Sequence, residues 1–102
     1  MPITHIVMFR FEPGFVTEDY LRYTAEQFDR LVQAVPGLLA SRVSRNCIAR
    51  EGNYDLYVRL TLENETVLPA YLAHPLHQQF AASHAHALLG RASIDFVEEN
   101  AP

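Results

Sequence analysis

The chain carries five histidines, and four of them cluster in its last third. Imidazole is the side chain whose ordinary pKa lets it exchange protons near neutral pH. On a helix over residues 75–89, His77, Phe80 and His84 share one largely apolar face. Tyr71 lies six residues before His77. A base, a phenol and a second imidazole around an apolar cavity would form a proton-transfer site.

His5 lies on a predicted strand, on the same face as Val7 and Phe9. If this face meets the helices, His5 and His77 approach each other in the layer between sheet and helices. The competing interpretation is that both are structural histidines, hydrogen-bonded to backbone. Spacing alone leaves both interpretations open.

The histidine spacing does not favour a metal site. His74 and His77 are three residues apart, but Pro75 interrupts the helix between them. His77 and His84 would lie about 10 Å apart along a helix axis, too far for one ion. We therefore expect no bound metal. The scattered glycines form no phosphate loop, so we expect no organic cofactor either.

The elements that must position these groups follow from periodicity and from Pro and Gly signals. Their order is strand, helix, strand, strand, helix, strand. This order predicts an α+β, ferredoxin-like βαββαβ protomer with a four-stranded antiparallel sheet and both helical segments on one face of it. We expect one domain over residues 3–98 and a tail over 99–102. The expected strands cover residues 3–12, 38–47, 54–63 and 91–98, and the expected helices cover 18–35, 65–73 and 75–89.

The sheet face away from the helices has no cover within the chain. We expect it to carry Ile6, Met8, Tyr57 and Val97. An exposed apolar face of this kind predicts association, and a second copy packed sheet to sheet about a two-fold axis is the simplest cover. The expected assembly is therefore a homodimer.

Composition excludes several classes of partner. The 102 residues carry a formal net charge of −4, with eight arginines and no lysine, which argues against binding nucleic acid or anionic lipid. No apolar run approaches the roughly 18 residues of a membrane span, and we expect a cytoplasmic protein. The lone Cys47 excludes an internal disulfide framework.

Three segments carry a resemblance to a known family. They are the opening strand His5–Phe11 with the pattern His-x-Val-x-Phe-x-Phe, the helix stop Val35-Pro36-Gly37, and the run Tyr71–Phe80 with the pattern Tyr-x-x-His-Pro-x-His-x-x-Phe. Together they resemble the stress-responsive dimeric α/β-barrel (Dabb) family. The resemblance implies a ferredoxin-like protomer that dimerises through its sheet into a barrel.

The family includes a plant polyketide cyclase, and the resemblance implies roles for matching residues. His77 would be the base, Tyr71 would bind and polarise the substrate, and His5 would lie in the pocket. Phe28 and Leu56 stand where the cyclase has a Tyr and a His, so the pocket would be more apolar. The full set of expected pocket residues is His5, Val7, Phe9, Phe28, Leu56, His74 and Phe80.

Two functions follow from this resemblance. One is a cofactor-free cyclase or lyase acting on a polyketide-like or aromatic small molecule. The alternative is a non-enzymatic dimer that takes part in a stress response or binds a small hydrophobic ligand.

Overall fold

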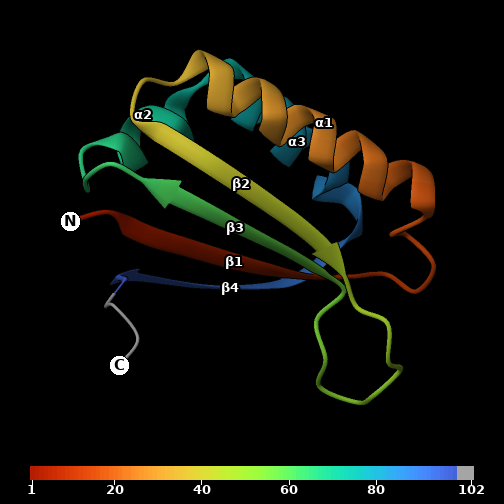
Figure 1. Ribbon diagram of the computed structural model, residues 1–102. Coiled ribbons are helices and arrows are strands. Elements are labelled where there is room, and N and C mark those ends of the chain that lie inside the picture. Colours follow the sequence, from red (N-terminus) through yellow and green to blue (C-terminus); the bar gives the residue numbers. More distant parts are fainter. Residues whose placement is uncertain (99–102) are drawn as a thin grey trace.

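The computed structural model describes residues 1–98, so the predicted tail over residues 99–102 lies outside the described residues. Its strands form one antiparallel sheet in the order β2-β3-β1-β4, and the helices lie together on one side of it (Figure 1). This arrangement confirms the predicted α+β, ferredoxin-like fold. The elements are β1 (Ile3–Phe11), α1 (Glu18–Ala34), β2 (Leu38–Arg45), β3 (Leu56–Leu62), α2 (Val67–Ala73), α3 (Pro75–His84), the 3₁₀ turn η1 (Ala85–Ala87) and β4 (Leu88–Val97).

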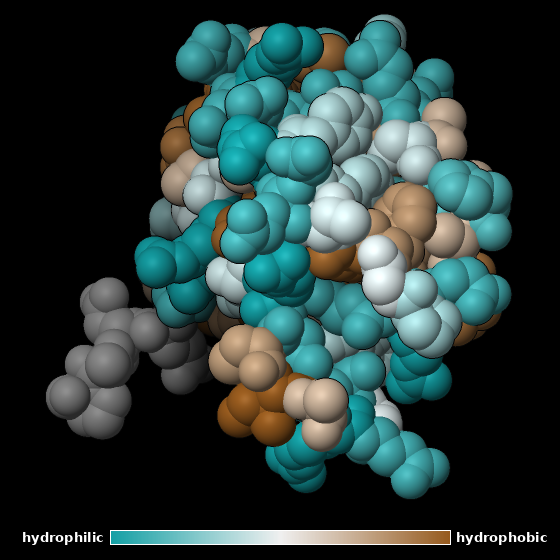
Figure 2. All heavy atoms as spheres, turned by 90° about the vertical axis from the view of Figure 1, so that its right-hand side faces the viewer, coloured by the Kyte–Doolittle hydropathy of each residue, from teal (hydrophilic) through white to brown (hydrophobic). Residues whose placement is uncertain are grey.

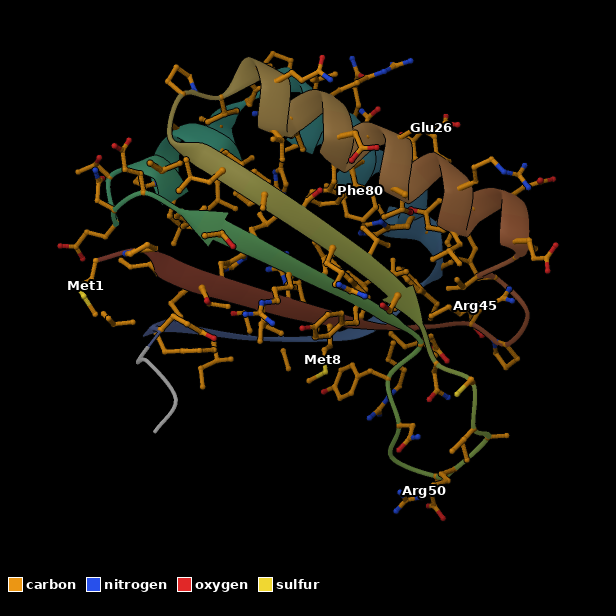
Figure 3. The ribbon with its side chains drawn as sticks, in the orientation of Figure 1. Met1, Met8, Glu26, Arg45, Arg50 and Phe80 are labelled. Carbon is orange, nitrogen blue, oxygen red and sulfur yellow. The ribbon has the colours of Figure 1, made fainter. Side chains whose placement is uncertain are left out.

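The core fills the layer between the sheet and the helices. In β3 every second side chain, from Leu56 to Leu62, is buried, which is the alternation of a strand covered on one face. Each fully buried Leu or Phe side chain contributes roughly 1.5–3 kcal/mol to folding. The largest fully buried side chains here include Phe28 and Leu31 of α1 and Phe80 of α3. Phe80 is labelled in Figure 3.

Helix α1 has well-defined ends. The Thr17 hydroxyl accepts a hydrogen bond from the Tyr20 backbone N–H at 3.1 Å, as an N-cap residue does. After the helix, Gly37 has a φ of +86°, and a Cβ there would lie 2.6 Å from Cγ2 of Val67. The chain therefore turns into β2 at a position that only glycine fits without strain.

The helix predicted over residues 75–89 is shorter in the structure. It ends at His84, and Leu88 already pairs with Phe11 of β1. The Glu12 N–H donates to the Ala87 carbonyl at 2.9 Å. The backbone of Ala87 and Leu88 is thus bonded to the end of β1 and to Glu12, so it cannot continue the helix. Strand β4 therefore begins at Leu88 rather than residue 91.

The loop between β2 and β3 is longer than predicted, since β2 ends at Arg45 and β3 begins at Leu56. Across its base, the Asn46 N–H donates to the Asp55 carbonyl at 3.0 Å. The Asp55 carboxylate accepts from the Phe11 N–H at 2.8 Å, which ties the loop to β1. Seen from the end of the molecule at which this loop protrudes, the surface is mainly hydrophilic with small hydrophobic groups (Figure 2).

The outer face of the sheet, away from the helices, differs from the prediction at one residue. Val97 pairs with Ile3, so it lies on the helix side with His5, and its predicted place on the outer face is wrong. The error is one residue of strand register, which moves a side chain to the opposite face. Ile94 and Phe96, which are 58% and 38% exposed, lie on the outer face instead. With Ile6, Met8 and Tyr57 they form its apolar surface.

None of the helices formed by residues 1–98 has both the length and the apolar character to cross a membrane.

We predict that Met8→Asp weakens a homodimer at least tenfold, because it would bury an unpaired charge in the sheet-to-sheet contact. Figure 3 shows Met8 on the sheet side opposite Phe80. Light scattering at micromolar concentration should give twice the 11.6 kDa chain mass for the wild type and a mass near 11.6 kDa for the variant. Ala82→Asp, at an exposed position of α3, should remain dimeric. A wild-type chain that is monomeric would contradict the prediction.

Candidate active site

A cavity of about 200 Å³ lies between the sheet and the two short helices. Strands β1 and β4 form its floor, and residues of α2 and α3 form its walls. The groups able to move protons or carry charge on its surface are His5, Tyr71, His77, His84, Arg91 and Asp95.

Strand register orders the floor of the cavity. On β1, Phe9, Val7 and His5 face the helices, and their partners on β4 are Arg91, Ser93 and Asp95. The cavity therefore runs from a Phe9–Arg91 end to a His5–Asp95 end. Adjacent pairs of this kind are two residues, about 6.6 Å, apart along a strand.

His5 is buried and paired with an acid. Its Nδ1 lies 2.5 Å from Oδ1 of Asp95, across the β1–β4 pair. With Nδ1–H donating to the carboxylate, the lone pair of a neutral ring is on Nε2. The ring also meets Tyr71 edge-on, with centroids 6.1 Å apart. The side chain is thus held by a carboxylate and not by the backbone bond of a structural histidine.

The ring of His77 makes one hydrogen bond within residues 1–98, from Nδ1 to the Leu72 carbonyl at 3.0 Å. A carbonyl can only accept, so Nδ1 carries the proton and Nε2 the lone pair. Burial lowers the pKa of His77 below its ordinary value of 6.5; the Leu72 carbonyl opposes this shift, and the charges of Arg91 and His5 add to it. His77 is therefore a neutral base at pH 7 with a defined tautomer.

Tyr71 lies against His77, with ring centroids 4.7 Å apart, and is 2% exposed. Its hydroxyl makes no hydrogen bond within residues 1–98. Every buried side-chain polar atom in this part of the chain has a hydrogen-bond partner, so the Tyr71 oxygen is not one of the buried atoms. The hydroxyl must therefore be accessible, and it opens onto the cavity that Tyr71 lines. Burial raises the pKa of Tyr71 well above 10, with Arg91 opposing the shift, so the phenol keeps its proton.

His84 occupies an aromatic environment at the Phe9 end of the cavity. Its ring centroid lies 5.1 Å from that of Phe9 and 4.7 Å from that of Phe80. Nδ1 is 3.0 Å from the Tyr20 hydroxyl, which also bonds Ser83 at 2.8 Å. Burial lowers the pKa of His84 to about 4, and Arg91 is the next contributor.

Three predicted pocket residues do not line this cavity. Phe28 is fully buried behind Tyr71 and Phe80, with centroids 6.1 Å and 5.0 Å away. Leu56 lies on β3, on the far side of β1 from β4, and packs in the core. His74 caps α3 instead, because its Nδ1 accepts from the Leu76 N–H at 3.1 Å.

The remaining predicted residues line the cavity: His5, Val7, Phe9, Tyr71, His77 and Phe80. Sequence reasoning missed Arg91 and Asp95. Their signal was the alternation of the last strand, in which the apolar Ala92, Ile94 and Phe96 alternate with polar residues. Since the apolar set faces outward, the polar set must face the helices.

No three His, Cys, Asp or Glu side chains within residues 1–98 are grouped so that they could hold a metal ion. His5 is bonded to Asp95 and His77 to the Leu72 carbonyl, whereas the Tyr71 hydroxyl and the Arg91 guanidinium have no partner within residues 1–98. The chemistry available from these residues is therefore proton transfer and charge stabilisation.

A sequence model of the stress responsive A/B barrel domain, Dabb, matches residues 3–98. The chain belongs to the Dabb family. No curated protein matches the chain.

Among solved structures, the chain is similar to a dimeric ferredoxin-like protein of unknown function from Thermobifida fusca. The two share 31% identity over 96% of this chain and 92% of the other, with a TM-score of 0.77. Protein At3g17210 from Arabidopsis thaliana is 20% identical over 98% of both chains, with a TM-score of 0.75. The hydroxynitrile lyase from Passiflora edulis is 13% identical over 99% of this chain and 97% of its own, with a TM-score of 0.73.

We predict that His84 makes the folded Dabb protein acid-sensitive. Its folded pKa of about 4 lies below the ordinary 6.5, so the unfolded chain binds more protons between these values. The free energy of unfolding should therefore fall as the pH drops from 6.5 to 4, by up to about 1.4 kcal/mol per pH unit from this group.

Urea unfolding at several pH values measures this slope. His84→Gln should flatten it without removing it, because His77 is shifted in the same direction. His86→Gln, at an exposed histidine two residues away, should keep most of the wild-type slope, because the charge of His86 makes the smallest contribution to the lowered pKa of His84. An unchanged slope in His84→Gln would contradict the assignment.

Proposed function

We propose that this Dabb protein is a cofactor-independent acid–base enzyme, a lyase or cyclase that acts on a small aromatic or polyketide-like carbonyl compound. The observation that carries the proposal is the pair formed by His77 and Tyr71 on the cavity wall. His77 is a neutral base of defined tautomer, and Tyr71 is a protonated phenol with an unpartnered hydroxyl within residues 1–98.

In the proposed reaction, Nε2 of His77 takes a proton from the carbon next to a substrate carbonyl. The electron pair of that C–H bond moves onto the carbonyl oxygen, and the Tyr71 O–H donates a hydrogen bond to the resulting oxyanion. The enolate carbon then attacks a second carbonyl of the same molecule, whose oxygen takes the proton back from His77, or the enolate expels a leaving group from the β-carbon, and that group takes the proton. General acid–base catalysis of this kind supplies on the order of 10²–10⁴ in rate.

Size and lining restrict the substrate. A cavity of about 200 Å³ is smaller than the roughly 300–1,000 Å³ of sites for drug-sized ligands. Val7, Phe9 and Phe80 supply apolar walls. A compound with one ring fits this space better than a fused polycycle. The resemblance to the plant polyketide cyclase supports the same roles for His77 and Tyr71, and the hydroxynitrile lyase has the same fold.

We predict that His77→Ala abolishes catalysis with little loss of stability. The one hydrogen bond that it removes is to the carbonyl of Leu72, an exposed residue, so water replaces it and the loss of stability should be about 1 kcal/mol or less. Phe80→Ala is the matched comparison, because Phe80 is 1% exposed and its truncation should cost about 3–5 kcal/mol.

Catalysis can be measured without knowing the natural substrate. The wild type should accelerate exchange of the α-protons of aryl methyl ketones and 1,3-diketones in D₂O, followed by ¹H NMR. Tyr71→Phe should slow this exchange roughly 10²–10³-fold, as the loss of one oxyanion donor does. A non-enzymatic binding protein would give no exchange above the buffer rate, or equal exchange in wild type and His77→Ala; either result refutes the proposal.

A further inference from the structure

The side chain of Arg91 lines the cavity but takes no part in the side-chain hydrogen bonds and salt bridges of residues 1–98. It lies on the helix-facing side of β4, opposite Phe9, and its side chain is exposed. Within residues 1–98 its guanidinium forms no salt bridge and no hydrogen bond, whereas Arg22 and Arg59 both pair with acids. A cation on the surface of the cavity is thus left without a partner in the described chain.

Residues 1–98 place no second acid on the cavity surface that could neutralise Arg91. Asp95 is the one carboxylate on its surface in residues 1–98, and that group is bound to His5. Asp95 is four residues from Arg91 on the same strand, about 13 Å along it. The positive charge of Arg91 instead lowers the pKa of Tyr71, His77 and His84.

We propose that Arg91 binds a carboxylate of the substrate, so that the cavity selects small aromatic or keto carboxylic acids over their neutral analogues. The planar guanidinium forms two parallel, charge-assisted hydrogen bonds with a carboxylate. The ring or acyl part of such an acid packs against Phe9 and Phe80, while its carbonyl reaches Tyr71 and His77. This substrate class rests on the proposed function, but the binding preference itself does not require catalysis.

The arrangement also has a chemical consequence for the proposed reaction. A carboxylate near the base would normally disfavour formation of a second negative charge on the same molecule. Pairing with Arg91 neutralises the carboxylate and removes this repulsion. Arg91 would therefore act as a specificity-determining residue for acids, and neutral ketones would be bound without its help.

The test uses benzoate and benzamide, which share size and ring but differ in charge. Binding is measured by NMR titration of the ¹⁵N-labelled full-length protein. The wild type should bind benzoate at least tenfold more tightly than benzamide. Arg91→Gln should remove that preference and leave benzamide affinity unchanged, and Arg91→Lys should restore part of it. Arg30→Gln, which removes an exposed arginine of α1, should behave as the wild type.

Acetate provides a second control, because it carries the carboxylate without the ring and should bind more weakly than benzoate. Equal affinity for benzoate and benzamide, no binding of benzoate by the wild type, or an unchanged preference in Arg91→Gln would each overturn the proposal. His77→Ala separates the two proposals: it should keep the benzoate preference while losing α-proton exchange. Loss of benzamide binding in Arg91→Gln would contradict the specificity role.

Discussion

The antiparallel pairing of β1 with β4 is the constraint on which the rest of the structure depends. Side chains alternate between the two faces of a strand, so a slip of one residue would exchange them. In the observed register, Arg91, Ser93 and Asp95 face the helices while Ala92, Ile94 and Phe96 face outward. The same pairing thus creates the polar floor of the cavity and the apolar outer face of the sheet.

Burial gives the cavity its chemistry. Phe9 and Phe80 pack against His84, Phe28 packs against Tyr71, and Tyr71 packs against His77. Burial favours the neutral form of His77, His84 and Tyr71. A neutral imidazole is a base and a protonated phenol is a donor, so the aromatic core sets both states together. Such polar groups are tolerated because single hydrogen bonds, as at His5 and His77, satisfy them.

The two ends of the cavity differ in what they offer a ligand. Asp95 at one end is already bound to His5, while Arg91 at the other end has no bound acid among the described residues. Tyr71 and His77 lie on the wall between sheet and helices, close to the His5 end. The proposed function and the proposed carboxylate preference thus rest on different side chains held by one scaffold, since β4 orients Arg91 and the short helices orient the other two.

The sequence by itself determined the order of elements, the fold and the Tyr71–His77–Phe80 cluster, because periodicity, Pro and Gly act over a few residues. Only the tertiary structure decided that Arg91 and Asp95 join this cluster and that Leu56 and His74 do not. It also decided where α3 ends, because the N–H of Glu12, directly after β1, donates to the Ala87 carbonyl. These outcomes depend on pairing between the first and last strands of the chain; alternation along a strand assigns each side chain to a face, but it does not give the partner across the pair.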